Sequence, residues 1–212
     1  MKKIYLFVCL VLCTFSIIIS SNAEINKRII VLDPGHGGMD GGAIVGEIKE
    51  SDLVLDICFK IKSIFENKGY IVIMTRNDRE SLCDGKFIKK EDMNKRVNII
   101  NESNASAAIS IHLNKFSISK YRGAQVFYSC VNYKNKQLAE QLQNSFELYL
   151  NDTKRKPQIR ENLYLLKRVS IPCCIVECGF MSNPEEFSLL LKEEYQYKIG
   201  YSILFAIDNF LK

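Results

Sequence analysis

Short apolar runs alternate with longer amphipathic segments along most of the chain, which is the pattern of an α/β fold. Most of these runs are continuously apolar, as expected for strands that are covered on both faces of a sheet. The strands predicted in this way cover residues 28–33, 70–75, 107–111 and 123–129, with a further one in "IPCCIVECGF" that ends at Glu177.

The amphipathic segments repeat apolar residues at helical spacing. Between residues 52 and 68 they recur every three or four positions, and Gly69 follows as a C-cap. Asn183, followed by Pro184 and two glutamates, is a typical helix start. Further helices are predicted at residues 93–102, 135–150 and 195–211. This order of elements predicts a single α/β domain, with a mostly parallel central sheet flanked by helices on both faces.

The first 23 residues differ from the rest in composition. Two lysines precede an apolar stretch of 16 residues, and small residues follow as far as Ala23. This stretch is shorter than the roughly 20 residues that a membrane span usually needs. Residues 1–23 are therefore predicted to be an export signal, with an N-terminal membrane anchor as the alternative. The formal net charge of +5 falls to +3 without them, and no basic run carries interleaved aromatic residues. Nucleic acid is therefore not an expected partner.

Six of the eight cysteines lie outside residues 1–23, and an even number in an exported protein would suggest disulfides. Cys58, however, lies on the apolar side of a predicted helix, and Cys173 and Cys174 lie within an apolar strand, where thiols pack as small hydrophobic groups. We therefore expect free thiols. The chain has no CxxC pair, so a zinc site built from cysteines is not expected.

The chain has only two histidines, and each follows an apolar run. His36 lies in the glycine-rich turn of "VLDPGHGG", and His112 ends the run "AAISIH". Ligands of open α/β sheets bind at the carboxyl ends of the strands. His36, His112 and Glu177 are thus expected on one rim of the sheet, and Glu50 joins them at the start of a helix.

Two imidazoles and one carboxylate form a common ligand set for catalytic zinc, and a second carboxylate nearby can accept a proton from water. The residues alone leave open which acid takes which role. Glu50 is also a normal first-turn acid of a helix, whereas a buried Glu177 would cost free energy unless it serves a purpose. Asp33 competes for the same role, although "DPG" is also a common turn in which the carboxylate caps local N–H groups.

Several of these segments together resemble a known family. "VLDPGHGG", "DGGA", Thr75–Arg76, "SIHLN" and "VECGFMSNPEE" are similar, in this order, to the zinc-dependent N-acetylmuramoyl-L-alanine amidases of type 3. The resemblance extends from Arg28 to Lys212 without large gaps. It implies a phosphorylase/hydrolase-like fold, with residues 24–212 as the catalytic amidase domain.

The resemblance also implies roles for the candidate residues. His36, Glu50 and His112 would hold one zinc ion, and Glu177 would act as catalytic acid and base in hydrolysis of the bond between the lactyl group of N-acetylmuramic acid and L-alanine. The chain departs from the family pattern in two places. Ser51 stands where lysine is usual, and Cys178 follows the catalytic acid, which suggests a thiol close to the metal.

Three further strings, "RVNIINESNA", "SKYRGAQVFY" and "LYLLKRVSIPCCIVECGF", are similar to the spore-cortex amidases of endospore-forming bacteria. This subgroup is implied to remove the stem peptide as the first step towards muramic-δ-lactam, with a polysaccharide deacetylase acting in the same pathway. The expected location is outside the cytoplasm, in the space between the membranes of the developing spore.

Substrate contacts are predicted from position alone. Asn114 follows His112 by two residues and so points to the same side, and Arg160 lies in a basic loop where it could meet a stem-peptide carboxylate. Two other functions stay open: a glycan-cleaving hydrolase that uses Glu50 and Glu177 as a carboxylate pair, and a non-catalytic envelope protein. Because no wall-binding module is recognisable, an accessory envelope protein is a further hypothesis.

Overall fold

The computed structural model describes residues 28–150 and 154–212 of the chain. The export signal or anchor predicted for residues 1–23 lies outside the described residues. Within the part that is described, no helix has the length and apolar character needed to cross a membrane.

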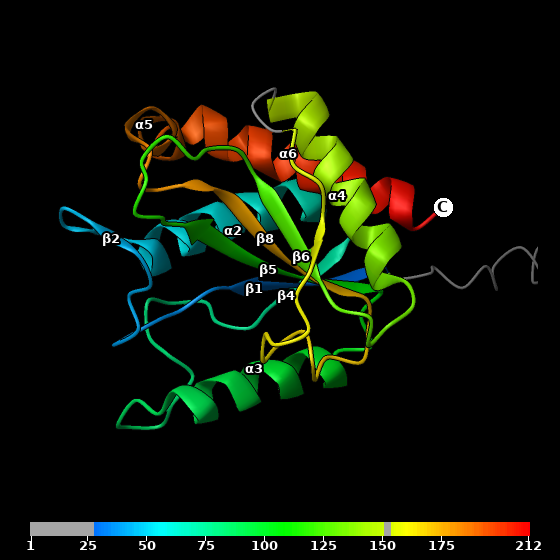
Figure 1. Cartoon of the computed structure of the whole chain (residues 1–212). Coiled ribbons are helices and arrows are strands. Elements are labelled where there is room, and N and C mark those ends of the chain that lie inside the picture. The colour runs from blue at the N-terminus through cyan, green and yellow to red at the C-terminus, as the bar shows by residue number, and fades with distance from the viewer. Residues whose placement is uncertain (1–27, 151–153) are drawn as a thin grey trace, which may run out of the picture.

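A six-stranded sheet forms the centre of the molecule (Figure 1). Its strands, in spatial order, are β4 (Ile71–Met74), β1 (Ile29–Pro34), β5 (Ala107–Asn114), β8 (Cys173–Phe180), β6 (Gln125–Tyr128) and β7 (Gln158–Ile159). The first four are parallel, β6 runs antiparallel to β8, and β7 is parallel to β6. The prediction of a mostly parallel sheet is confirmed.

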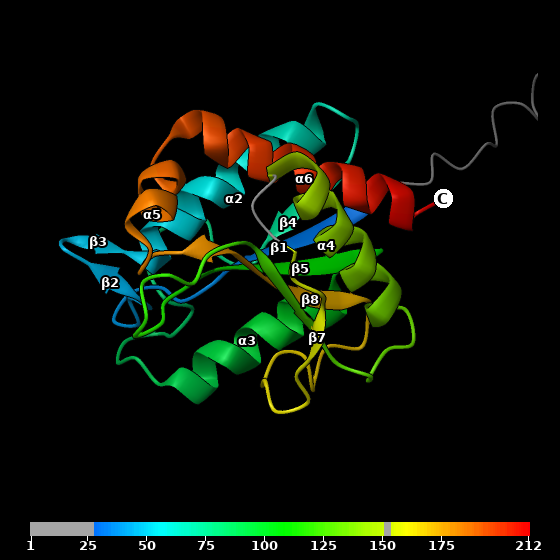
Figure 2. The same cartoon turned by 45° about the horizontal axis from the view of Figure 1, so that its top comes forward.

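Helices cover both faces of the sheet, as predicted (Figure 2). The helices on one face are α2 (Glu50–Glu66), α4 (Asn135–Leu150) and α6 (Glu193–Phe210), and α6 packs against both of the others. Helix α3 (Lys89–Glu102) covers the other face together with the segment that precedes β8. Alternate residues of each strand face the two sides, so that Val176 packs in the larger core under α2 and Ile175 in the smaller core under α3.

The element boundaries differ from the predictions in instructive ways. The short helix α5 (Pro184–Leu190) begins as predicted, because the Asn183 side chain accepts the N–H of Glu186. By contrast, α2 ends before Gly69, since Asn67 is its C-cap. The hairpin of β2 (Ile44–Val45) and β3 (Ile48–Lys49) and the strand β7 were not predicted, because two-residue strands are too short to show a periodicity.

All six cysteines within the described residues are free thiols, which confirms that prediction. Cys58, Cys173 and Cys174 are buried among apolar side chains.

Candidate active site

The loop after β1 holds His36 in an unusual backbone conformation. The φ angle of His36 is 60°, in the left-handed region that few residues other than glycine adopt. Two buried guanidinium groups hold this loop by its carbonyl oxygens. Arg76 donates to Pro34 O (3.1 Å) and Gly35 O (2.8 Å), and Arg96 donates to Pro34 O (2.6 Å) and to His36 O.

Gly35 allows the loop to pass close to His112. A Cβ atom at Gly35 would lie 2.3 Å from Cε1 of the His112 ring, a distance that no side chain can tolerate. The absence of a side chain at this position therefore lets the two histidines approach each other. Their ring centroids are 4.9 Å apart.

Glu50 is the first residue of α2 and is only 4% exposed. Its Oε2 accepts the N–H of Ala43 (2.8 Å), and its Oε1 accepts the N–H of Leu113 (3.0 Å). Gly42, with φ of 65°, leaves the room that this carboxylate needs, because a Cβ there would lie 2.5 Å from Oε2. The carboxylate is thus fixed by backbone groups of two separate segments.

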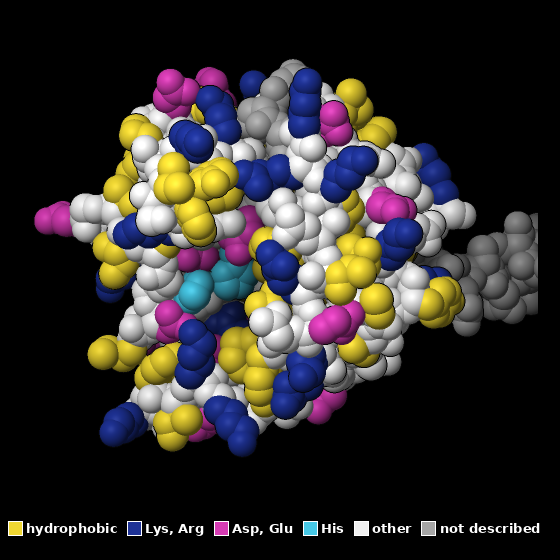
Figure 3. All heavy atoms as spheres, in the orientation of Figure 1, with side chains coloured by type: hydrophobic (Ala, Val, Ile, Leu, Met, Phe, Trp, Pro, Cys, Tyr) yellow, Lys and Arg dark blue, Asp and Glu magenta, His cyan; other side chains and the backbone are white. Residues whose placement is uncertain are grey.

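His36, Glu50 and His112 form a compact cluster. The histidine side chains, shown in cyan in Figure 3, lie in a hollow of the surface. Glu50 Oε1 lies 3.0 Å from His112 Nδ1 and 3.3 Å from His36 Nε2. The three potential ligand atoms all lie within 4.8 Å of one another. Residues from three separate segments therefore converge in an arrangement that can hold a metal ion.

The electrostatics of the cluster keep the carboxylate charged. Burial opposes the charge of Glu50, but the adjacent rings of His112 and His36 outweigh it and hold the pKa of Glu50 far below its usual value. Burial also disfavours the charged form of His112, yet Glu50 and Glu177 together raise the pKa of His112. An ionised carboxylate is the state that a metal ligand requires, and a bound metal ion would take the place of the proton that the raised pKa favours on His112.

Asp40 supports the outer side of His36. Its Oδ1 lies 2.9 Å from His36 Nδ1, within ion-pair distance, although the approach lacks the geometry of a hydrogen bond. A carboxylate against the second nitrogen of a metal-binding histidine orients the ring and selects its tautomer. Asp40 was not predicted as a site residue, although it lies four residues after His36 in the same glycine-rich loop.

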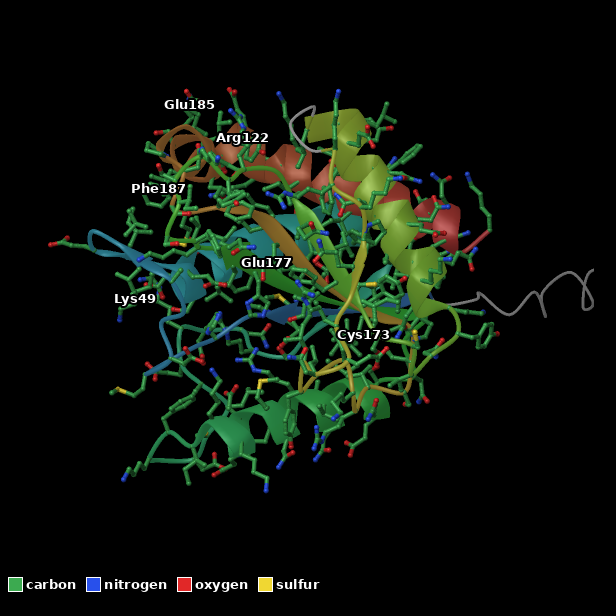
Figure 4. All side chains as sticks on the ribbon, viewed as in Figure 1. Lys49, Arg122, Cys173, Glu177, Glu185 and Phe187 are labelled. Carbon is green, nitrogen blue, oxygen red and sulfur yellow. The ribbon has the colours of Figure 1, made fainter. Side chains whose placement is uncertain are left out.

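Glu177, labelled in Figure 4, lies on β8 and is paired with His112 on β5. The residue is partly exposed, but its Oε2 is buried and makes no hydrogen bond. Burial is the main reason that the pKa of Glu177 is raised to about 7, and Glu50 adds to this effect while His112 and His36 oppose it. A carboxyl group of this kind is suited to take up and release a proton near neutral pH.

Two cavities lie near the cluster, one lined by cluster residues and the other by residues beyond Glu177 as seen from His112. One, of about 220 Å³, lies between the cluster and α3 and is lined by His36, His112 and Asp40 among others. The other, of about 310 Å³, contains both predicted substrate contacts, Asn114 and Arg160, in its wall. The structure therefore brings these two residues together, although they lie far apart in the sequence.

Two expectations from the sequence were wrong. Cys178 does not face the metal cluster, because successive residues of a strand point to opposite faces, and its side chain packs in the larger core. Asp33 does not cap the N–H groups of its own turn. Its carboxylate instead accepts from Arg96 (2.7 Å), Thr75 (2.6 Å) and Ser110 (2.6 Å).

The buried ion pair between Asp33 and Arg96 was not predicted from the sequence. Arg96 also donates to Asp92 (2.7 Å), so one guanidinium connects two carboxylates and the His36 loop. Asp33 and Arg96 are 63 residues apart, and no local pattern shows that they meet.

The chain matches the N-acetylmuramoyl-L-alanine amidase family over residues 30–209. The chain belongs to this family. This amidase is 40% identical over 184 residues to the germination-specific N-acetylmuramoyl-L-alanine amidase of Bacillus subtilis. The aligned region covers 84% of this chain and 78% of that protein. The resemblance to an amidase, including the spore-related group, is thus confirmed at the level of the family and this relative.

Two further comparisons agree with this assignment. The amidase is similar in structure to the CwlD amidase from Clostridioides difficile in complex with the GerS lipoprotein, with a TM-score of 0.81, 37% identity, and coverage of 87% of this chain and 98% of that chain. It is 30% identical over 229 residues to N-acetylmuramoyl-L-alanine amidase AmiA of Escherichia coli, with 87% of this chain and 76% of that protein covered.

Proposed function

We propose that this amidase is a zinc enzyme in which His36, Glu50 and His112 hold one zinc ion and Glu177 is the catalytic acid and base. The observation that carries this proposal is the pairing of a His/Glu/His cluster with a buried carboxylate oxygen, Glu177 Oε2, that has no partner. Two imidazoles and one carboxylate are a zinc ligand set that leaves a position open for water or substrate.

The bond to be broken joins the lactyl group of N-acetylmuramic acid to L-alanine of the stem peptide. A bound zinc ion would polarise the carbonyl group and lower the pKa of water. Glu177 takes the proton from the attacking water on Oε2 and then returns it to the amine of L-alanine as that group leaves. Burial raises the pKa of Glu177, which favours the uptake of a proton from water by its carboxylate. A bound cation would lower this pKa.

The carboxylate-pair glycosidase considered from the sequence has little support. Both oxygens of Glu50 are already engaged, Oε2 by the N–H of Ala43 and Oε1 by the N–H of Leu113 and the histidines. Such a carboxylate is well placed as a fixed ligand but poorly placed as a nucleophile. For substrate contacts we propose Asn114 and Arg160, which line one cavity beside the cluster.

We further propose that the enzyme acts outside the cytoplasm on spore-cortex peptidoglycan, as the first step towards muramic-δ-lactam. A polysaccharide deacetylase would complete the lactam ring. The germination-specific relative supports this setting. Residues 1–23 would serve as export signal or anchor, ahead of a catalytic domain formed by residues 24–212.

An accessory envelope protein is part of the same proposal, supported by the CwlD amidase that was solved together with the GerS lipoprotein. A pull-down with the full chain from sporulating cells tests it. Recovery of no specific partner would count against this part of the proposal.

The central experiment measures peptide release from purified cortex peptidoglycan by the full chain, using mass spectrometry with added zinc or with a chelator. We expect free peptides that begin with L-alanine, no new glycan ends, and loss of release in chelator. His112→Ala should lose both zinc and activity. Unchanged zinc content in this variant, or new glycan ends with the wild type, would overturn the proposal.

A further inference from the structure

The cavity that contains Asn114 and Arg160 has a third feature, which no sequence pattern indicated. Gln125, the first residue of β6, lies in its wall and is only 2% exposed. Its side-chain oxygen, Oε1, is buried and has no hydrogen-bond partner. Buried acceptors without a donor are rare in folded proteins, and each one requires an explanation.

Sheet register places this amide next to the proposed catalytic acid. Gln125 is paired with Glu177 across β6 and β8, and Glu177 is paired with His112 across β8 and β5. Side chains of directly paired residues point to the same face of a sheet. His112, Glu177 and Gln125 therefore form a row of three side chains, and Gln125 is the end of the row that is farther from the metal cluster.

The orientation of the Gln125 amide is fixed by its nitrogen. Nε2 donates to Lys156 O at 2.7 Å and to Val126 O at 3.3 Å. Both of these partners are carbonyl oxygens, which only accept, so the amide cannot be reversed without losing these two bonds. Oε1 is thereby held as an acceptor, and the group that it lacks is an N–H or O–H donor.

Charge distinguishes the two cavities. Arg155 and Arg160 line the cavity of Gln125, and no carboxylate lines it among the residues that the structure describes. The guanidinium of Arg160 is kept in place by Gln158 Oε1 (2.9 Å) and by the ring of Phe127, whose centroid is 5.1 Å away. The cavity on the α3 side is lined by the three carboxylates of Asp33, Asp40 and Asp92 and by two cationic side chains, Lys89 and Arg96. An anionic part of the substrate is thus favoured on the Gln125 side.

A peptide that carries carboxylates meets both requirements, because it offers N–H donors and negative charge. We propose that the Gln125 cavity binds the stem peptide on the amine side of the cleaved bond, with Gln125 Oε1 accepting the first peptide N–H beyond L-alanine and the two arginines facing carboxylates further along. This inference rests on the proposed amidase function and assigns a side of the site to each half of the substrate.

The experiment compares two muramoyl peptides that differ at one position, where the first peptide N–H beyond L-alanine is replaced by an ester oxygen. For the zinc-loaded full chain, we expect kcat/KM to fall about fivefold to tenfold on this replacement, the size of one uncharged hydrogen bond. In Gln125→Met the two substrates should be cleaved equally well. The loss should lie mainly in KM, since the proton transfer by Glu177 is unaffected.

Gln143→Met is the matched control, because Gln143 is buried against the same strand from the other side. Its Oε1 accepts the N–H of Val126 (2.9 Å) and its Nε2 donates to Ala124 O (3.0 Å). This variant should be less stable than the wild type but should keep the full preference for the N–H substrate. Equal cleavage of both substrates by the wild type would overturn the inference.

A binding titration separates this inference from the proposed function. The released peptide and the muramic acid disaccharide are each titrated into the full chain and into Gln125→Met. We expect weaker peptide binding in the variant and unchanged disaccharide binding. The opposite result would make the cavity a glycan site and would overturn the inference. Absence of cleavage by the wild type, by contrast, would count against the proposed function, and the titration would still test the cavity.

Discussion

Two groups of polar residues lie on the same face of the sheet and differ in whether their buried oxygens have hydrogen-bond partners. In the Asp33 network (Asp33, Thr75, Asp92, Arg96 and Ser110), each oxygen of Asp33 accepts at least one hydrogen bond. In the Glu177 row (His112, Glu177 and Gln125), two buried oxygens have no partner. The difference agrees with the roles proposed above, in which the network stabilises the scaffold and the row contacts the substrate.

The largest expected effect that separates the two groups is on catalysis. Glu177→Gln keeps the shape of the side chain but cannot take up a proton, so kcat should fall about 10²-fold to 10⁴-fold. The free energy of unfolding should not fall, because Oε2 makes no bond that the change removes. Peptide release and urea unfolding measure the two quantities on the same protein.

Glu186→Gln is the matched control for this variant. Glu186 is fully buried, and its oxygens accept the N–H groups of Gly123 (2.9 Å) and Phe180 (2.7 Å). Its replacement should lower stability with a much smaller loss of kcat. If both glutamates lowered stability to the same extent, Glu177 would be a structural residue and its proposed role would be wrong.

The second expected effect is on stability. Arg96→Met leaves the carboxylates of Asp33 and Asp92 buried without their common partner, which should cost about 3–5 kcal/mol of unfolding free energy. It also removes the donor to the carbonyl oxygen of His36, so zinc should bind less tightly. Chemical denaturation and zinc titration measure these losses.

Lys95→Met is the control for charge, since Lys95 contacts Asp84 (2.5 Å) and Glu91 (3.4 Å) at the surface. Surface ion pairs contribute little, and this variant should resemble the wild type in both measurements. A large loss of unfolding free energy in both variants would mean that burial of the Asp33 network does not explain the effect of Arg96→Met.

A smaller effect concerns stability in acid. Burial would raise the pKa of Asp33, but Arg96 and the bonds from Ser110 and Thr75 outweigh it and lower the pKa. The resulting stabilisation is complete above the unfolded-state pKa of ~3.9 and is lost as the pH falls below that value. Asp33→Asn should therefore unfold with a shallower pH dependence below about pH 4. A slope identical to that of the wild type would contradict the lowered pKa.

The smallest effect tests the orientation of β8. Cys178→Ala removes a thiol from the larger core and should cost about 1 kcal/mol, with kcat/KM unchanged, because the side chain points away from the row. Cys174→Ala, which removes a thiol from the same face of β8, should behave in the same way. A clear change in the activity of the Cys178 variant alone would show that its thiol reaches the site.

The parts of the site that follow from short sequence patterns could be predicted. His36 and His112 follow long apolar runs, and such runs predict both a strand and the position of its carboxyl end. The alternation of strand residues would also have placed Cys178 on the face opposite Glu177, a signal that the motif-based interpretation overlooked.

Other parts depend on pairings that no local pattern contains. Gln125 follows an alanine and precedes a valine in an ordinary strand, and its importance appears only when β6 is paired antiparallel with β8. The same holds for Asp33 and Arg96, whose partnership is set by the packing of α3 on the sheet. Burial, register and missing partners are properties of the folded chain.

The ion pair between Arg28 and Asp208, 3.6 Å apart, joins the start of β1 to the end of α6. Both ends of the described fold thus lie near the amino end of β1. His36 follows the carboxyl end of this strand, on the opposite side of the sheet's rim. A tether or surface attached at either end would leave the hollow with His36 and His112 facing outward, accessible to an insoluble polymer that cannot diffuse to the enzyme. In this geometry an enzyme that is attached at one end can still reach a solid substrate with its active site.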